Sequence, residues 1–160
     1  MKDKRVVVTG LGAITPIGNN IEEFLNGLKN GISGANKITR FDSRNFKTRF
    51  ACELKGYDVN NFFEKKESRK LDAFTQYGII AVDEAVKDSL IDFEKINKDN
   101  FGVIWGSGVG GIETFQNQII EYNNSDIPRF SPFFIPKLIP DICPGYISIK
   151  YGIRGPNFAT

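Results

Sequence analysis

The sequence contains no histidine and only two cysteines among its 160 residues. Without histidine, these residues cannot supply a histidine base, a histidine-ligated zinc site, or a Ser-His or Cys-His pair. Cys52 and Cys143 are too far apart in the sequence to form a metal-binding motif. We therefore expect neither a metal site nor a complete set of catalytic residues within this span.

Long apolar runs and a strong net charge are missing as well. No stretch approaches the roughly 20 apolar residues of a membrane span, and the start, MKDKRVVV, has no apolar run of signal-peptide length. The formal net charge of +2 creates no global field that would favour nucleic acid. We expect a cytoplasmic protein with no nucleic-acid or membrane partner.

The apolar content that is present suits a globular protein. Hydrophobic residues make up 41% of the chain, and Phe, with 14 copies, is over-represented. This composition indicates a large apolar interior, an apolar pocket or an apolar interface. Because no low-complexity linker divides the chain, we expect one structural unit.

Two segments follow the pattern of a strand, a glycine-containing loop and a helix. In the first, we predict a buried strand at 5–9 and a helix that starts at the N-cap Asn20 and ends at Gly31. In the second, we predict a strand at 101–105 and a helix from Ile112 to about Tyr122. Strands that alternate with helices predict an α/β fold with a parallel or mixed sheet.

Three further predictions concern the remaining segments. Residues 50–54 alternate as a half-buried strand would, with Cys52 on its inward face. A long helix is predicted from about Ser68 to Leu90, with small residues in its apolar stripe. Pro144 is predicted to kink or delay a helix that follows Pro140.

The two glycine loops allow alternative interpretations. The first loop, Gly10 to Gly18, is similar to a dinucleotide-binding fingerprint, but Thr15 replaces the third glycine. A tight strand exit that needs positive φ explains it more simply. The second loop, 106–111, lacks the Lys-Ser/Thr of a P-loop. Its glycines suit a backbone that lies close to a neighbouring strand or a bound chain.

Five segments, taken in order, resemble the elongating type II β-ketoacyl-acyl-carrier-protein synthases of fatty acid biosynthesis. They are RVVVTGLGAITPIG, RKLDAFTQYG, GSGVGG, SPFFIP and the final YGIRGPNFAT. The resemblance implies the thiolase-like fold, layered αβαβα, with only most of the first half present. Residues 1–160 would be the N-terminal part, apparently truncated before the catalytic cysteine.

The resemblance also implies a reaction. A cysteine about four residues after Thr160, activated at a helix N-terminus, would carry the acyl chain, and histidines would follow much later. The enzyme would condense that acyl chain with malonyl-carrier protein by decarboxylative Claisen chemistry, without a cofactor. The 160-residue span alone is predicted to be inactive and poorly stable. A catalytically inactive chain-length-type partner and an unrelated nucleotide-binding α/β domain are the alternatives.

The resemblance assigns a carrier-protein docking surface to the basic residues Lys66, Arg69 and Lys70, with Arg129 as a weaker fourth. Acyl carrier protein is acidic, so cations at these positions would attract it. From the residues alone, the same cluster is a solvated basic face that nearby glutamates partly neutralise.

An acyl-binding pocket is the second implied site. The resemblance makes Val109 a gate and places Phe133, Phe134 and Ile135 along the pocket wall at a homodimer interface. Ordinary packing is the alternative for these residues. Cys143 has no neighbouring cations in the sequence, so we expect a buried, inert thiol and not a nucleophile.

Overall fold

The computed structural model describes residues 5–160, and its contacts divide the chain into two compact units. The first unit comprises the chain up to Asp58 together with Ile80–Ile91, and the second comprises Val59–Ile79 and Asp92–Thr160. The long helix α3, Ala73–Ser89, contributes residues to both units. The expected single unit is therefore two units that share a helix without an intervening linker.

The first unit contains α1 (Ile21–Lys29) and a short antiparallel pair, β1 (Asn36–Lys37) and β2 (Phe50–Ala51). The Asn20 side chain accepts a hydrogen bond of 2.8 Å from the Glu23 N–H, which caps α1. After α1, Gly31 adopts a φ of 63°. Both predicted ends of this helix are thus confirmed.

The buried strand predicted at 5–9 does not form. Val6, Val7 and Val8 are 92%, 57% and 79% exposed, and this segment belongs to no strand. A strand needs a hydrogen-bonded neighbour, and no strand among residues 5–160 pairs with this segment. The strand predicted at 50–54 is limited to Phe50–Ala51, and Cys52 is exposed, so its predicted inward packing is wrong.

Gly10 and Gly12 lie against the second half of α3. A Cβ atom at Gly10 would be 2.1 Å from the Ala85 carbonyl oxygen, and one at Gly12 would be 1.9 Å from that of Ala81. Neither glycine has positive φ, so the predicted conformational reason for them is wrong. They are needed because the loop backbone touches the helix backbone, as the small residues of α3 allow.

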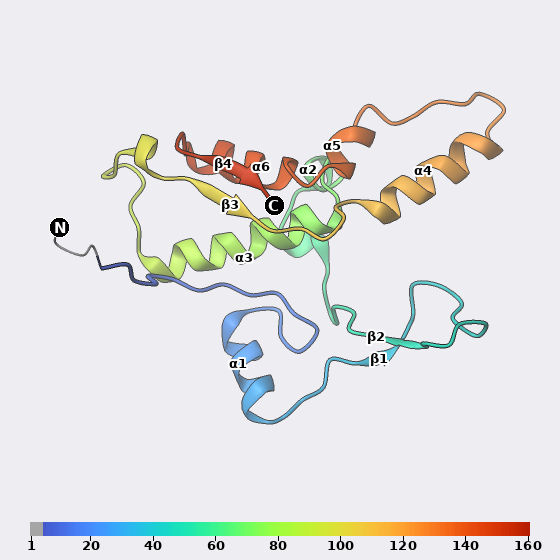
Figure 1. The fold of residues 1–160 in the computed structure, drawn as a ribbon, viewed down its shortest axis with the longest axis horizontal. Helices are drawn as coiled ribbons and strands as arrows, with labels where there is room; N and C mark the ends of the chain where they lie inside the picture. The colour runs from blue at the N-terminus through green and yellow to red at the C-terminus, as the bar shows by residue number, and fades with distance from the viewer. Residues whose placement is uncertain (1–4) are drawn as a thin grey trace. The chain divides into compact units, whose positions relative to one another are not determined.

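The second unit contains the other elements of the chain. These are η1 (Val59–Asn61), α2 (Lys65–Ser68), η2 (Lys98–Asn100), β3 (Val103–Trp105), α4 (Ile112–Asn124), α5 (Phe134–Leu138), α6 (Ile142–Tyr151) and β4 (Asn157–Ala159). β3 and β4 pair in parallel, and α6 packs against both strands. A parallel pair joined through helices confirms the α/β prediction (Figure 1).

The core of the second unit forms where α3 meets α6 and β3. Thr75, Cys143 and Ile147 are fully buried or nearly so. At Gly78, an added Cβ would lie 2.6 Å from the Cys143 sulfur and from the Trp105 ring. Glycine at this position therefore lets α3 approach its neighbours closely.

Two helix predictions need correction. The helix predicted from Ser68 to Leu90 is broken, because α2 ends at Ser68 and α3 begins at Ala73. Asp72 is the last residue between the two helices, and its carboxylate accepts a hydrogen bond of 3.3 Å from the Phe74 N–H at the start of α3. The kink predicted at Pro144 is absent: Pro144 lies in the first turn of α6, where a backbone N–H needs no helical partner.

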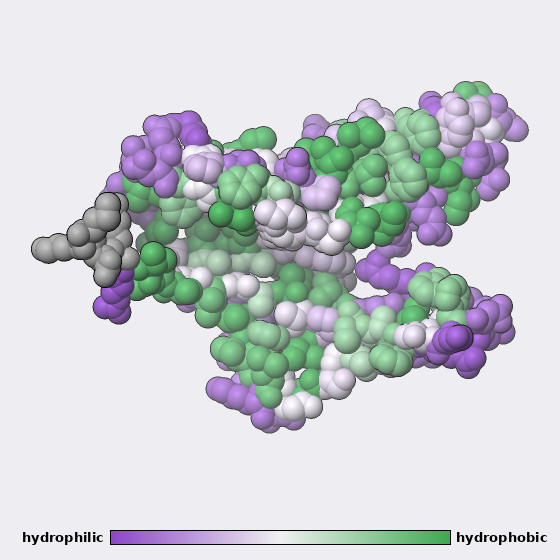
Figure 2. Space-filling view, viewed as in Figure 1, coloured by the Kyte–Doolittle hydropathy of each residue, from purple (hydrophilic) through white to green (hydrophobic). Residues whose placement is uncertain are grey.

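Large apolar side chains reach the surface of both units (Figure 2). Ile104 and Phe158 are partners in the β3–β4 register, and both are exposed. No helix within residues 5–160 is long and apolar enough to cross a membrane.

Candidate functional site

The glycine loop 106–111 leaves β3 and is pressed against α5. A Cβ atom at Gly110 would lie 2.3 Å from the Leu138 carbonyl oxygen, and one at Gly111 would lie 2.0 Å from that of Lys137. The Gly111 N–H also donates a hydrogen bond of 3.0 Å to the Leu138 carbonyl. The predicted close backbone approach is confirmed, but the neighbour is the helix α5 and not the expected strand or bound chain.

Val109 lies in the centre of this loop and is 63% exposed. Gly110, the next residue, has a φ of 78°, a conformation that glycine tolerates best. The backbone of the loop therefore packs against α5, while the branched apolar side chain of Val109 is exposed to solvent.

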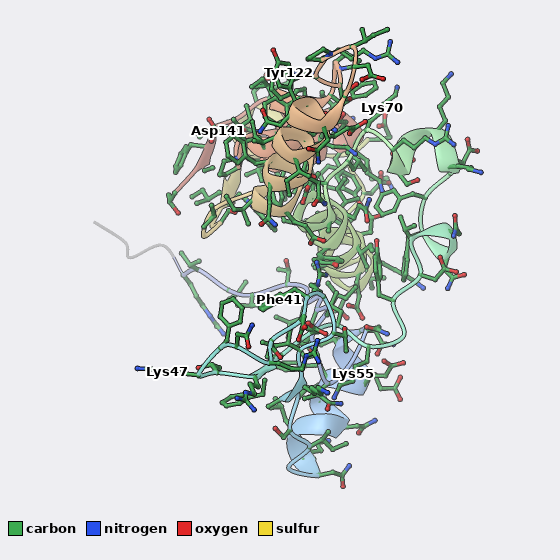
Figure 3. The ribbon with its side chains drawn as sticks, turned by 90° about the vertical axis from the view of Figure 1, so that its right-hand side faces the viewer. Phe41, Lys47, Lys55, Lys70, Tyr122 and Asp141 are labelled. Carbon is green, nitrogen blue, oxygen red and sulfur yellow. The ribbon has the colours of Figure 1, made fainter. Side chains whose placement is uncertain are left out.

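The aromatic residues at the start of α5 have different neighbours. Lys70 Nζ lies 6.0 Å from the centroid of the Phe133 ring. Phe134 stacks on Phe115 and Phe130, at centroid distances of 5.9 and 4.7 Å. This stack continues to Tyr122 on α4, whose ring Figure 3 locates. Ile135 is exposed.

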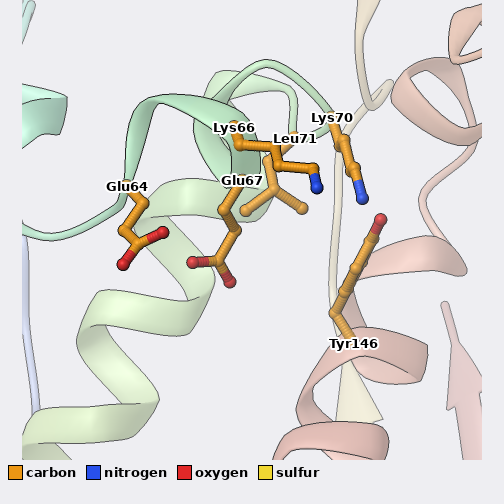
Figure 4. Close-up of a pocket in the computed structure, with 6 residues that line it drawn as sticks. All are labelled: Glu64, Lys66, Glu67, Lys70, Leu71 and Tyr146. Atoms are coloured by element: carbon orange, nitrogen blue, oxygen red, sulfur yellow. The ribbon is translucent and has the colours of Figure 1, made fainter.

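Two of the predicted docking residues line one pocket. Lys66 and Lys70 help to line a pocket of about 390 Å³. Figure 4 shows the Lys70 side chain directed toward the Tyr146 hydroxyl, which also lines the pocket. The other lining residues are Glu64, Glu67 and Leu71. Arg69 and Arg129 are exposed, but neither lines this pocket.

Sequence reasoning missed two neighbours of Lys70. It did not identify Tyr146, which α6 brings to Lys70 from a distant part of the chain. It also placed Lys70 and Phe133 in separate sites, whereas the Lys70 ammonium lies over the Phe133 ring. No local pattern could have revealed either contact, because both depend on how α2, α5 and α6 pack.

Cys143 has the environment of an inert thiol. Its side chain is completely buried, and burial raises the pKa of the thiol to about 12. A thiol with that pKa stays protonated near neutral pH and is a poor nucleophile. The expectation that Cys143 is buried is confirmed.

The first loop does not offer a site for a dinucleotide phosphate. The Glu84 carboxylate accepts hydrogen bonds from the Ile21 N–H at 2.8 Å and from the Ala13 N–H at 2.9 Å. Ile21 begins α1, so a carboxylate already occupies the helix end at which a pyrophosphate would bind. The nucleotide-binding alternative does not fit this arrangement.

The part of the chain that the structure describes has no cluster of three or more His, Cys, Asp or Glu side chains placed to hold a metal ion. The chemical groups that it does present are two lysines and two glutamates beside a tyrosine, an exposed valine and a run of aromatic rings. These groups can form polar contacts with a partner and offer apolar surface to a ligand.

Comparison with known proteins gives this arrangement a context. The chain is 44% identical over 159 residues to 3-oxoacyl-[acyl-carrier-protein] synthase 2 of Staphylococcus aureus (strain COL), covering 99% of this chain and 38% of that protein. It is 38% identical to the synthase 2 of Synechocystis sp., covering 100% of this chain and 38% of the relative. The chain therefore spans less than half the length of these curated relatives.

Solved structures show the same fold. One is a type II polyketide synthase acyl-carrier protein in complex with its ketosynthase bound to the hexaketide, with a TM-score of 0.76 at 26% identity, covering 99% of this chain and 41% of that chain. Another is the ishigamide ketosynthase/chain length factor, with a TM-score of 0.84 at 22% identity, covering 96% and 39%. The fold is thiolase-like, as in these ketosynthases, and is present in part.

Residues 3–160 match the family model described as beta-ketoacyl synthase, N-terminal domain. The match extends over nearly the whole chain, and it agrees with the five sequence motifs and with the fold. The chain belongs to the beta-ketoacyl synthase family.

Proposed function

We propose that the complete protein is a 3-oxoacyl-[acyl-carrier-protein] synthase of fatty acid biosynthesis. The observation that carries this proposal is the 44% identity to the S. aureus synthase 2 along 99% of the chain. A chain-length-type partner has less support, because the ketosynthase/chain length factor is only 22% identical and is informative about the fold alone.

The proposed reaction joins two carrier-bound thioesters. A cysteine thiolate attacks the acyl thioester, and the first carrier leaves as a thiol. The malonyl group of a second carrier then loses carbon dioxide, and the freed electron pair attacks the acyl carbonyl. The new C–C bond expels the cysteine thiolate and yields a 3-oxoacyl thioester two carbons longer. Backbone N–H groups would stabilise the oxyanion.

The catalytic cysteine is proposed to follow Thr160 in the complete protein. If so, acyl-carrier protein should acylate the full-length enzyme at that residue, and peptide mass spectrometry should find the adduct there. Cys52 and Cys143 should carry no acyl group and so serve as internal controls. A chain-length-type partner would lack the cysteine and give no adduct, which would contradict the proposal.

Acyl carrier protein is the proposed partner. One neighbouring ketosynthase has been solved together with its acyl-carrier protein, which supports a partner of the same kind here. We assign the docking surface to Lys66, Arg69 and Lys70, with Arg129 as a weaker member. The shared pocket of Lys66 and Lys70 supports this assignment, because both lysines line one accessible hollow, together with Glu64 and Glu67.

Charge reversal tests the docking surface. The double variant Arg69→Glu, Lys70→Glu should raise the KM for carrier protein about tenfold at low salt and leave kcat nearly unchanged, since long-range attraction is lost. Lys47→Glu in the first unit is the control, because Lys47 is an exposed lysine elsewhere on the chain (Figure 3). An unchanged KM in the double variant would overturn the assignment.

The acyl pocket is proposed to contain Val109 and Phe133, with Phe134 and Ile135 contributing less. The exposure of Val109 supports this role, since an acyl chain needs accessible apolar surface. We further propose that the enzyme is a cytoplasmic homodimer in which Phe133, Phe134 and Ile135 approach the pocket at the subunit interface.

A further inference from the structure

Asp72 occupies the junction between the proposed docking segment and α3. It follows Lys70 by two residues and the buried Leu71 by one. One carboxylate oxygen accepts a hydrogen bond of 3.3 Å from the Phe74 N–H, and the Asp72 carbonyl accepts one of 3.0 Å from the Gln76 N–H. The backbone at Asp72 is thus fixed by α3, and the carboxylate has one oxygen left for another partner.

That second oxygen accepts a hydrogen bond from the Thr114 hydroxyl. Thr114 is in the first turn of α4, immediately after the glycine loop, and lies 42 residues from Asp72 in the sequence. Both side chains are partly buried. A hydrogen bond to a charged acceptor is stronger than one between neutral groups, so this contact ties the start of α4 to the start of α3.

The carboxylate also lies against the loop backbone. A Cβ atom at Gly111 would be 3.0 Å from the Asp72 carboxylate and 2.0 Å from the Lys137 carbonyl oxygen. The backbone at Gly111 therefore lies against both the Asp72 carboxylate and α5, and we call this arrangement the clamp. Val109 lies two residues earlier in the same loop.

We propose that Asp72, acting through Thr114, is a positioning residue that fixes the glycine loop and thereby sets which acyl chains Val109 admits. This inference rests on the proposed function, because it treats Val109 as the gate. Neither Asp72 nor Thr114 needs to touch the acyl chain. Their effect would be on selection among acyl chains and not on carrier binding.

The test uses the full-length enzyme and the substitution Thr114→Val, which removes the hydroxyl and keeps the side-chain shape. The ratio of kcat/KM for long and short acyl-carrier substrates should change about three- to tenfold, while the KM for carrier protein stays within about twofold. Thr114→Ser restores the hydroxyl and should restore the ratio. Adding Asp72→Asn to Thr114→Val should change the ratio little further, since both variants remove one interaction.

Hydrogen exchange supplies a readout that does not need activity. The Gly111 amide, which donates to the Leu138 carbonyl, should exchange faster in Thr114→Val than in the wild type or in Thr114→Ser. The proposal would be overturned if Thr114→Val kept the wild-type ratio of kcat/KM values and the wild-type exchange rate of the Gly111 amide. It would also be overturned if Thr114→Ser behaved like Thr114→Val. If the wild type forms no condensation product, the proposed function fails, and the exchange rates still decide whether Asp72 and Thr114 position the loop.

Discussion

The two glycine loops look alike in the sequence but differ in their contacts. In the loop 10–18, glycines touch the α3 backbone and the Glu84 carboxylate accepts two backbone N–H groups. In the loop 106–111, glycines touch the α5 backbone and the Asp72 carboxylate accepts a side-chain hydroxyl. A carboxylate holds each loop: Glu84, within α3, holds the first, and Asp72, immediately before α3, holds the second.

The difference lies in what each loop leaves accessible. Glu84 accepts one backbone N–H from within the first loop and one from the start of α1, so that loop serves to join α1 to α3. The second loop is held at its end, and Val109 remains 63% exposed. A glycine pattern by itself therefore indicates close backbone approach, and the neighbouring side chains decide whether the loop is also a site.

The largest expected effect is from a methyl group placed where the second loop meets α5. Gly111→Ala should lower the free energy of unfolding by about 3 kcal/mol, because the new Cβ would overlap the Lys137 carbonyl oxygen and the backbone must move. Gly108→Ala in the same loop is the matched control, since a Cβ there meets nothing within 4 Å. Chemical denaturation of both variants measures the difference, and equal stabilities would refute the clamp.

A smaller effect is expected when a bulky side chain is placed in each loop, because only the second loop is proposed to contact the acyl chain. Val109→Trp should lower kcat/KM for long acyl substrates about tenfold relative to short ones, because the larger side chain narrows the proposed pocket. Leu11→Trp, at an exposed apolar position of the first loop, should leave the profile unchanged. If Val109→Trp left the use of long acyl chains unaltered, the gate assignment would fail.

The smallest effect is expected from the anchor of the first loop. Glu84→Gln should cost about 1 kcal/mol of stability, since the charged acceptor of two backbone hydrogen bonds becomes neutral. The acyl-chain profile should not change. Glu121→Gln, at an exposed glutamate on α4, is the control for charge removal. A shift in substrate preference with Glu84→Gln would show that the two loops are not separate in function.

Local patterns predicted the parts of the fold that local interactions determine. The N-cap Asn20 and the positive φ of Gly31 define α1, and both were predictable because the sequence signals lie next to the helix. The strand expected at Val6 to Val8 was not, because pairing depends on a neighbour elsewhere in the protein. The break at Asp72 was missed since the apolar spacing continues through it.

The candidate site divides in the same way. Family motifs led us to assign docking to Lys66 and Lys70 and a gate to Val109, and these roles remain predictions. Tyr146 beside Lys70, and the clamp from Asp72 to Thr114, join residues distant in the sequence. Such contacts depend on helix packing, which residue spacing does not determine.

We propose that this chain belongs to an enzyme that condenses carrier-bound acyl groups. Full-length protein incubated with acyl- and malonyl-carrier protein should release carbon dioxide and form an equal amount of 3-oxoacyl-carrier protein, two carbons longer by mass spectrometry. Carbon dioxide release without that product, or no reaction of either substrate, would contradict the claim.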